Sequence, residues 1–399
     1  MNSGLVLTIN GGSSSVRFAV FEASDPSRRV LHGKIDRVGL SGSTLQFSVS
    51  EEEGRHSLSA PAPEKQSATD FLMDWLEAQP TFGSVEAVGH RVVQGMQHSQ
   101  PERITPELLD DLRKATPYDP DHLPYEIELI EAIGKRYPGL PQVACFDTAF
   151  HRTMPRVATL LPIPRKYAAK GLQRYGFHGL SYEFLLEELV RTGGPAARKG
   201  RTILAHLGNG ASLAAVLDGE SIDTTMGFTP TGGTVMGTRT GDLDPGVAYF
   251  LAREEGVTAD GLQKMFNHES GLLGVSETSS DMRDLLAAEP SDVRAAEAVA
   301  LFCYEAKKWL GALAAALGGL DTLVFSGGIG ENSPVVRERI CAGLGFLGID
   351  MDQARNAEAK DVISSEESRV EVRVIRTDEE LMIARSVLRL LNLGAAVTV

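Results

Sequence analysis

The chain has 399 residues, and its 39 lysines and arginines against 53 aspartates and glutamates give a net charge of −14. This length is enough for two domains, each with its own hydrophobic core. The acidic balance argues against a nucleic-acid backbone or an anionic membrane as the partner. Any anion site in this protein therefore requires a local cluster of cations.

Three cysteines, Cys145, Cys303 and Cys341, lie apart in apolar surroundings and lack the spacing of a metal site. We therefore expect reduced core thiols in a cytoplasmic protein. The opening residues, MNSGLVLTIN, have no basic region and too short an apolar run for a signal peptide. The longest apolar run, residues 309–320, is too short to span a bilayer.

The first third of the chain is rich in strand patterns. Alternating apolar runs predict strands over residues 5–9, 16–21, 30–35, 45–49, 85–93 and 143–147. Asn10-Gly11-Gly12 between the first two runs is typical of a tight hairpin turn. Helical spacing appears over residues 65–78, and Thr105 can cap a second helix that begins with Pro106. A proline-broken segment, 115–124, leads into a third helix through residue 132.

The central part of the chain repeats the opening pattern. Residues 203–207 and 212–216 read as two strands joined by Gly208-Asn209-Gly210, and Asp218-Gly219 is a plausible second turn. A Thr- and Gly-rich segment follows with Arg239, Asp242 and Asp244. So many glycines allow the backbone to wrap a charged ligand. A third apolar run, from residue 322, ends in glycines and predicts a strand-to-helix turn.

Helices are predicted over residues 182–191, from 292 to about 317 behind a Ser291 cap, and over 379–391, with a strand over 370–374. Strand-rich blocks followed by helices occur twice. This favours two α/β halves with mixed sheets, a duplicated domain that holds a nucleotide between its halves.

Several motifs resemble those of the acetate kinases, in that family's order. They are INGGSSSVRFAVF, GHRVV, CFDTAFHRTMP, RYGFHGLSYEFL, HLGNGASLAAV, DTTMGFTPTGGTVMGTRTGDLDPG, ESGLLGVSETSSDMRDL, VFSGGIGENS and VIRTDEELMIA. The resemblance runs from residue 9 to residue 384, nearly the whole chain.

The resemblance implies an α/β fold of two RNase-H-like domains, as in acetate kinase, sugar kinases and actin, with the nucleotide in the interdomain cleft. It places an acyl-substrate domain at residues 1–147 plus 385–399 and a nucleotide domain at 148–384. It further implies a cytoplasmic homodimer whose small-molecule substrates are ATP and acetate. The reaction is reversible, direct in-line transfer of the γ-phosphoryl group to acetate, with Mg²⁺ or Mn²⁺ as cofactor.

The family's functional residues map onto this sequence by motif. Asp147, His178 and Arg239 fall on catalytic positions, and Asn10 and Glu379 on metal-associated positions. Substrate positions fall on Arg91, Val93, Phe177, Pro230 and Tyr118. Nucleotide positions fall on Arg17, His206, Leu207, Gly208, Asn209, Gly210, Asp281, Met282, Arg283, Gly328, Ile329, Gly330, Glu331 and Asn332.

These residue types suit phosphoryl transfer to a carboxylate. The acceptor is already ionised at neutral pH, so the main task is to bring two anions together and to stabilise charge on the moving group. Guanidinium groups are permanently charged and can bind carboxylate or phosphate in bidentate fashion. Arg91 could hold the acceptor and Arg239 the transferring group, while His178 could donate a hydrogen bond to it.

Four departures from the family pattern leave alternatives open. Arg17 replaces a lysine, and Gln94 and Tyr182 replace histidines. Tyr118 stands where a further active-site histidine aligns. A propionate- or butyrate-preferring kinase and a catalytically weak nucleotide-binding protein therefore remain alternatives to an acetate kinase. Taken singly, Arg91 also fits a surface ion pair and Asp147 a turn or cap residue.

Overall fold

The computed structural model describes residues 4–12, 15–36, 38, 43–50, 54, 56–60 and 65–394. The chain divides into two compact units. Unit 1 comprises residues 1–149 and 378–399, and unit 2 comprises residues 150–377. The motifs place the second boundary at 384/385, but the helix from Glu379 to Leu391 is continuous through that point and belongs wholly to unit 1. Glu379 and Asn10 therefore lie in the same unit.

Strands and helices of unit 1 follow the predicted order. Its strands are β1 (Leu5–Gly11), β2 (Ser15–Glu22), β3 (Arg29–Asp36), β4 (Thr44–Val49), β5 (His56–Ser59), β6 (Val85–Val92), β7 (Glu102–Arg103) and β8 (Gln142–Phe146). Its helices are α1 (Lys65–Glu77), α2 (Pro106–Ala115), α3 (Leu123–Arg136) and α15 (Glu379–Leu391), with short 3-10 turns at Phe82–Ser84, Thr116–Tyr118 and, across the unit boundary, Ala149–Thr153.

Unit 2 contains β9 (Arg201–Leu207), β10 (Ala211–Leu217), β11 (Glu220–Thr224), β12 (Thr322–Ser326) and β13 (Glu371–Val374). Its helices are α4 (Arg156–Thr159), α5 (Arg165–Ala168), α6 (Gly179–Gly193), α7 (Pro245–Glu254), α8 (Ala259–His268), α9 (Gly271–Ser276), α10 (Met282–Ala288), α11 (Val293–Leu317), α12 (Gly327–Asn332), α13 (Pro334–Cys341) and α14 (Gln353–Ala357), with 3-10 turns at Pro195–Arg198 and Gly345–Leu347.

The two sheets share one topology, which confirms the predicted pair of mixed α/β halves. In unit 1, β1 pairs antiparallel with β2 and parallel with β6, and β8 pairs parallel with β6. In unit 2, β9 pairs antiparallel with β10 and parallel with β12, and β13 pairs parallel with β12. The strand orders β3-β2-β1-β6-β8 and β11-β10-β9-β12-β13 are therefore equivalent.

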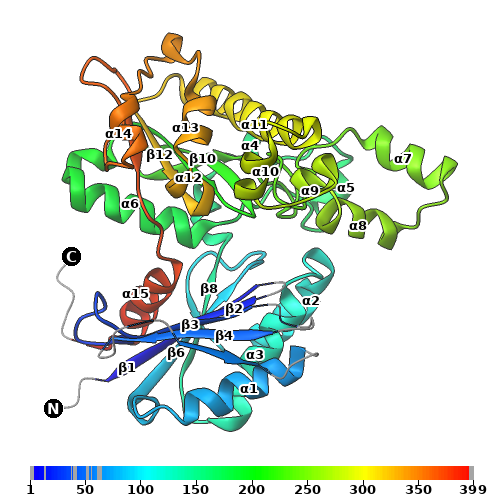
Figure 1. Ribbon diagram of the computed structural model, residues 1–399. Coiled ribbons are helices and arrows are strands. Elements are labelled where there is room, and N and C mark those ends of the chain that lie inside the picture. Colours follow the sequence, from blue (N-terminus) through cyan, green and yellow to red (C-terminus); the bar gives the residue numbers. More distant parts are fainter. Residues whose placement is uncertain are drawn as a thin grey trace. The chain divides into compact units, whose positions relative to one another are not determined.

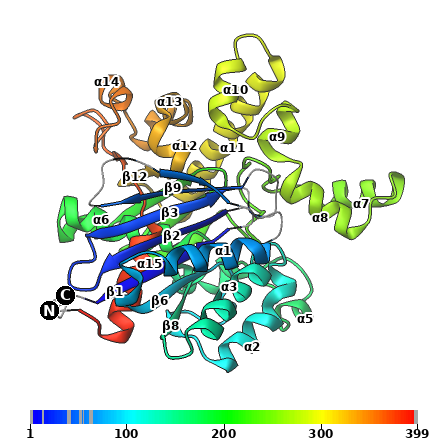
Figure 2. The ribbon, with the colours of Figure 1, turned by 60° about the horizontal axis from the view of Figure 1, so that its bottom comes forward.

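Helices cover both faces of the unit 1 sheet (Figures 1 and 2). On one face, Leu72 of α1 and Leu129 of α3 pack in a cluster with Ile9 of β1 and Phe18 of β2. Helix α15 packs against β1 and β6. Because side chains alternate along a strand, Phe18 points into the core while Arg17 beside it is exposed.

The predicted turns and caps have clear physical causes. Thr105 caps α2 by accepting a hydrogen bond from the Leu108 amide, as predicted. Asp218 and Gly219 both have positive φ, which matches the twist of the β10–β11 hairpin. The predicted Ser291 cap is wrong by one residue, because Asp292 accepts from the Arg294 amide and caps α11.

All three cysteines are buried and form no disulfide. Burial raises the pKa of Cys303 to about 11 and that of Cys341 to about 12, so both thiols stay protonated. Within the described ranges, no helix combines the length and apolar character that crossing a bilayer requires.

Arg337 is fully buried in unit 2 and ties three segments together. Its Nη1 donates to the carbonyls of Gly330 and Glu331 at 2.8 and 3.0 Å. Its Nε and Nη2 donate to the side-chain and backbone oxygens of Asn356 at 2.8 and 2.7 Å. One guanidinium therefore links the C-terminal part of α12 to α14.

We expect Arg337→Met to lower the free energy of unfolding of unit 2 by at least about 3 kcal/mol, because each buried carbonyl left without a donor costs about 1–3 kcal/mol. Urea unfolding checks this in a Trp75→Phe background, where Trp309 on α11 is the remaining tryptophan and reports unit 2. The control is Arg294→Met, which removes two surface ion pairs, with Glu277 and Asp292, and should leave the unfolding midpoint near its original value. Equal midpoints for the two variants would contradict the assigned role.

Candidate active site

Parallel strands bring three predicted site residues of unit 1 to one edge of the sheet. Asn10 lies near the end of β1, Arg91 near the end of β6, and Asp147 directly after β8. Since these strands run in the same direction, their carboxyl ends lie together, which is where ligands bind in many α/β folds. The three residues are far apart in the sequence but lie close together in the fold.

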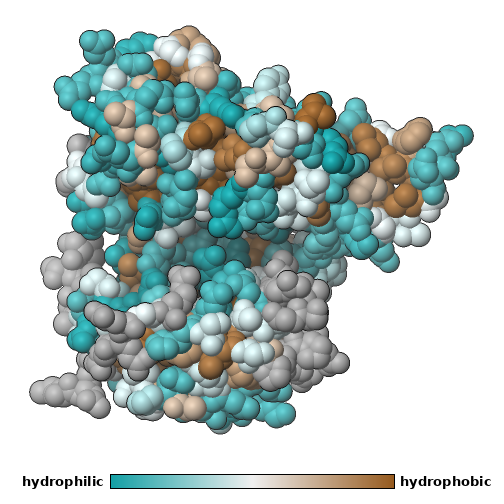
Figure 3. All heavy atoms as spheres, in the orientation of Figure 1, coloured by the Kyte–Doolittle hydropathy of each residue, from teal (hydrophilic) through white to brown (hydrophobic). Residues whose placement is uncertain are grey.

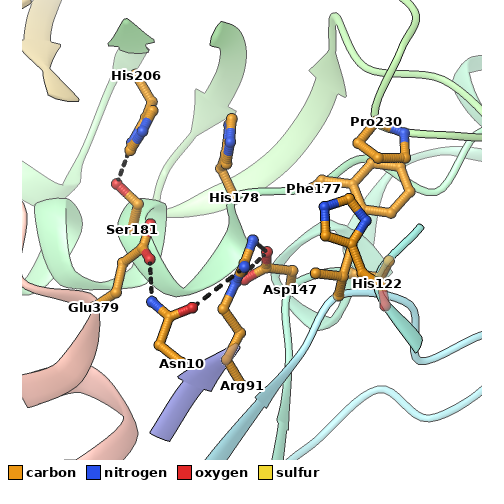
Figure 4. Close-up of polar contacts among 12 residues, drawn as sticks. Asn10, Arg91, His122, Asp147, Phe177, His178, Ser181, His206, Pro230 and Glu379 are labelled. Carbon is orange, nitrogen blue, oxygen red and sulfur yellow. Dashed lines mark hydrogen bonds and ion pairs between the residues drawn. The ribbon is translucent and has the colours of Figure 1, made fainter. Parts of the chain in front are cut away.

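Arg91 is held in place by hydrogen bonds from all three nitrogens of its guanidinium (Figure 4). Its Nε and Nη2 both donate to Asp147 Oδ2, at 2.9 and 2.6 Å, and its Nη1 donates to Asn10 Oδ1 at 3.3 Å. A guanidinium carries five N–H donors. Within the part of the chain that the structure describes, one N–H on each terminal nitrogen is left over, which is enough for a bidentate contact with a carboxylate.

Glu379 completes this cluster from the first residue of α15. Its Oε2 accepts a hydrogen bond from Asn10 Nδ2 at 3.0 Å. Burial by itself would lower the pKa of Arg91, but the carboxylates of Asp147 and Glu379 outweigh burial and raise it. Arg91 is therefore charged at every physiological pH, and its charge is anchored by a carboxylate that is itself buried.

Val93 and Glu126 form the next layer of unit 1. The buried Val93 amide donates to both carboxylate oxygens of Glu126, at 3.1 and 3.3 Å. Burial raises the pKa of Glu126 well above its ordinary value, although Arg91 opposes this shift. Sequence patterns gave no sign of Glu126, because a glutamate in the first turn of a helix is usually exposed.

Tyr118 and His122 lie in the segment between α2 and α3. Tyr118 ends the 3-10 turn Thr116–Tyr118 and is half-buried. Four residues later the buried His122 bonds through Nδ1 to Asp119 Oδ1 at 2.8 Å. The sequence gives no sign of this buried pair beyond the i, i+3 spacing of Asp119 and His122.

Gln94 and Arg17, the other departures in unit 1, have distinct settings. Gln94 is fully buried, and its Oε1 accepts from the Met96 amide at 2.8 Å. Its Nε2 has no partner among the residues that the structure describes. Arg17 is exposed on β2, directly opposite Asn10 in the strand register. It is thus the one nucleotide-assigned residue that lies in unit 1.

In unit 2 the Gly208–Gly210 turn follows β9 and lies against the start of α12. A side chain at Gly327 would meet the Leu207 carbonyl at 2.7 Å, and Gly327 has a φ of +76°, so only glycine fits there. A Cβ at Gly208 would lie 3.7 Å from the amide nitrogen of Gly328. Backbone groups from the ends of β9 and β12 thus approach one another closely.

Two histidines lie beside this turn with their rings stacked 4.3 Å apart, His178 and His206 (Figure 4). His178 caps α6 with a φ of +60°, an unusual conformation for a residue other than glycine. Such conformations cost about 1–3 kcal/mol and cluster at functional sites. A Cβ at Gly210 would lie 3.3 Å from His178 Nε2 and 3.7 Å from Arg239 Nη1. His178, His206 and Arg239 therefore converge on the turn.

The Thr- and Gly-rich segment holds Arg239 through a network of backbone contacts. Arg239 Nη1 donates to the Pro230 carbonyl at 3.2 Å. Asp242 accepts from the Gly233 amide at 2.8 Å, and Asp244 caps α7. Both aspartates are thus engaged in shaping the loop, while Arg239 faces the glycine turn.

Segments 281–283 and 328–332 contribute in different ways. Asp281 caps α10 by accepting from the Arg283 amide at 2.9 Å, so its carboxylate already has a structural partner. Glu331 Oε1 accepts from the Gly327 and Thr377 amides at 3.0 and 3.1 Å. Glu331 thereby fixes the first turn of α12 beside the glycine turn.

The oxygens of Asn10 and Glu379 fit a magnesium ion that keeps most of its waters. Mg²⁺ in phosphoryl-transfer sites is held by one or two protein oxygens together with substrate phosphates. Among the described residues no group of three His, Cys, Asp or Glu side chains could enclose a metal by itself. Asn10 and Glu379 are in direct contact, so one ion could reach both.

Comparisons with known proteins identify the family of this chain. Residues 5–385 match the Acetokinase family. The acetate kinase of Rhodopseudomonas palustris is 44% identical, with 98% of this chain and 100% of that protein aligned. A propionate kinase of Citrobacter rodentium is 40% identical, over 96% of each chain.

Solved structures lead to the same family. The crystal structure of Porphyromonas gingivalis acetate kinase superposes with a TM-score of 0.87 at 39% identity, covering 97% of this chain and 100% of that one. The fold is thus that of the two-domain acetate kinases, as the motifs indicated. The chain belongs to the acetokinase family.

Proposed function

We propose that this protein is an ATP:acetate phosphotransferase, which transfers the γ-phosphoryl group of ATP reversibly to acetate and forms acetyl phosphate and ADP. The observation that carries the proposal is the fixed guanidinium of Arg91. Asp147 and Asn10 accept from three of its five N–H groups, and one N–H on each terminal nitrogen remains for a carboxylate. Phosphoryl transfer to an anion needs such a charged, preorganised acceptor site.

Unit 1 binds the acceptor in this proposal. Arg91 neutralises the carboxylate and orients one of its oxygens as the nucleophile. No general base is required, because a carboxylate is ionised at neutral pH. Val93 contributes to the apolar surface that receives the short acyl chain, and Glu126 fixes its backbone.

Unit 2 binds the nucleotide. The backbone of the Gly208–Gly210 turn and the start of α12 receive the phosphates. Arg239 and His178 donate hydrogen bonds to the equatorial oxygens of the transferring group, where negative charge is spread in the transition state. Both donors are fixed beforehand, Arg239 by the Pro230 carbonyl and His178 by Ser212. Little reorganisation is then needed at the moment of transfer.

Magnesium is the cofactor that we propose, held by Asn10 and Glu379 directly or through water. When bound, it neutralises phosphate charge and joins the phosphate oxygens. The three buried, reduced thiols support a cytoplasmic location.

Acetate is our preferred acceptor, with propionate as the second candidate, since family relatives carry either name. Val93, Phe177 and Pro230 are all buried and fall on the acyl-pocket positions. A protein that only binds nucleotide would not need an arginine that is held in place with two N–H groups left for a carboxylate ligand, as Arg91 is. This feature argues against the binding-protein alternative.

With ATP and Mg²⁺, the purified protein should convert acetate to acetyl phosphate, trapped as the hydroxamate, and should form ATP from acetyl phosphate and ADP. Propionate and butyrate assayed in parallel rank the acceptors. Absence of turnover with two-, three- and four-carbon acids in both directions would refute the kinase assignment and leave nucleotide binding alone.

The two arginines should differ in their kinetic effects. Removal of one preorganised donor to developing charge lowers kcat by about 10²–10³-fold, and we expect Arg239→Ala to do so. Arg91→Ala should in addition raise KM for acetate, because it removes the acceptor contact. Arg191→Ala, which changes an exposed arginine near the end of α6, is the control. If a folded Arg91 or Arg239 variant kept wild-type kcat/KM, the role assigned to that residue would be wrong.

We further propose that the protein is a homodimer. Neither α7 nor α8 has a buried residue in the single chain. Apolar side chains gather over these helices in Figure 3, and Tyr249 and Phe250 are 65% and 56% exposed. Exposed apolar patches on helices with no core contact are typical of surfaces that pack against a partner, and a second copy of the chain is always available.

Light scattering should give twice the chain mass of 42.9 kDa. The double variant Tyr249→Asp/Phe250→Asp should shift the protein to the monomer, because it places charge in the apolar surface. Phe346→Asp alters a side chain that is 74% exposed elsewhere in unit 2 and should stay dimeric. A monomeric wild-type protein, or a double variant that remains dimeric, would rule out this surface.

A further inference from the structure

Glu126 is a buried glutamate in the first turn of α3, at the edge of the unit 1 sheet that carries Arg91. Its side chain is 3% exposed. A Cβ at Gly11, the last residue of β1, would lie 3.7 Å from Glu126 Cγ. The carboxyl group also accepts from the amide of Val93, directly after β6. Glu126 thus lies between the ends of β1 and β6, beside the acceptor site of the proposed function.

The Glu126 carboxyl group has few hydrogen-bond donors for a buried acid. A single N–H group, the amide of Val93, lies 3.1 Å from Oε2 and 3.3 Å from Oε1. Within the part of the chain that the structure describes, no other donor and no ion pair reaches this carboxyl group. A buried carboxylate that is ionised normally needs a paired cation or several donors. One shared N–H group is too little to hold a full negative charge there.

The charges around Glu126 also disfavour its ionised form. Burial raises the pKa of Glu126 most, Arg91 opposes this rise, and Asp119 and Asp147 add to it. The Arg91 guanidinium is engaged by Asp147, to which Nε and Nη2 donate at 2.9 and 2.6 Å (Figure 4). Asp119 Oδ2 is itself buried and has no hydrogen-bond partner among the described residues. Three buried carboxyl groups thus lie near one guanidinium, and a proton on one of them lowers their mutual repulsion.

The helices packed against α3 make their charged contacts elsewhere on its surface. Arg136 pairs with Asp74 of α1, and Glu131 pairs with Arg113 of α2. Before α3, His122 bonds through Nδ1 to Asp119 Oδ1 at 2.8 Å. The charge that acts on Glu126 therefore comes from the edge of the sheet and from the segment that precedes α3.

We infer that Glu126 is a positioning residue for the acceptor, which as an uncharged carboxylic acid holds the Val93 amide and adds no negative charge beside Arg91. The inference deepens the proposed function and rests on it. Acetate is an anion, so a further ionised carboxyl group at this edge would oppose its binding to Arg91. The carbonyl oxygen of a neutral carboxyl group still accepts from an N–H group, so the Val93 contact is kept without the charge.

The first test measures the proton on Glu126 and needs no substrate. Glu126→Gln keeps an oxygen for the Val93 amide and removes the titrating group. Above the ordinary pKa of 4.5, the unfolded wild-type chain loses the Glu126 proton while the folded chain keeps it. The unfolding equilibrium constant of wild type, divided by that of Glu126→Gln, should therefore rise about tenfold per pH unit from pH 5 to pH 7. A ratio that is constant, or that levels off below pH 7, would show an ionised Glu126 and overturn the inference.

Urea unfolding of the full chain in a Trp309→Phe background provides these constants, since Trp75 on α1 is then the remaining tryptophan and reports unit 1. Glu107→Gln is the matched control on α2. Hydrogen bonds from its own backbone amide and from Thr105 lower the pKa of Glu107, so this group is ionised in both states above pH 5. Its ratio should stay constant over the same range.

A second measurement covers the case that Glu126→Gln does not fold. Burial also raises the pKa of Glu380, so the variant Glu380→Gln removes its signal from ¹³C spectra of the labelled glutamate carboxyl groups. A signal of a protonated acid should remain in this variant at pH 7. If no such signal remains, Glu126 is ionised and the inference is wrong.

The second test is kinetic and compares a neutral hydrogen-bond acceptor with none. At pH 7, Glu126→Gln should keep KM for acetate within about twofold of the wild-type value, because the amide oxygen still accepts from Val93. Glu126→Met has a side chain of similar length but leaves the buried Val93 amide without an acceptor. It should raise KM for acetate by roughly two- to tenfold, the loss expected for one hydrogen bond, with KM for ATP unchanged.

Equal KM values for acetate in Glu126→Gln and Glu126→Met would overturn the inference. A rise in KM for ATP that matches the rise for acetate would also overturn it, because it would indicate a general structural role. Absence of turnover in the wild-type protein would refute the kinase assignment and with it the acceptor role of Glu126. The unfolding test of the Glu126 proton does not depend on activity, so the two failures can be told apart.

Discussion

Parallel pairing of the central strands is the constraint on which both units depend. Parallel strands need crossover connections, and their carboxyl ends all face one edge of the sheet. In unit 1 this edge carries Asn10, Arg91 and Asp147, and in unit 2 it carries the Gly208–Gly210 turn and the start of α12. The same topology thus builds an edge of charged side chains in one unit and an edge rich in backbone amides in the other.

An acidic chain that handles anions must concentrate its positive charge. Asp147 is buried and holds the Arg91 guanidinium in one orientation, so the position of this positive charge is fixed. A buried ion pair of this kind gains little net stability, because both charges lose their water. Its value lies in orientation. The positive charge of Arg91 is held in one place by Asp147 and Asn10, which is what electrostatic preorganisation requires.

In unit 2, buried hydroxyl groups fix the orientation of two histidine side chains. Ser212 and Tyr182 orient His178, and Ser181 orients His206, without any added charge. The left-handed backbone of His178 indicates that the surrounding structure, rather than local preference, fixes this ring.

Much of this arrangement could be predicted from the sequence, for a physical reason. Hairpin turns such as Asp218-Gly219, caps such as Thr105 and strand alternation such as Arg17–Phe18 are local effects, so the residues themselves specify them. The motifs also pointed to Arg91, Asp147, His178 and Arg239 as a set. Only the tertiary structure decided which of them touch. It paired Arg91 with Asp147, joined Asn10 to Glu379 across the whole chain, and used Asp281 as a helix cap. It also revealed Ser212, Glu126 and His122, whose roles have no local signal because burial and hydrogen-bond partners are set by strands that are distant in sequence.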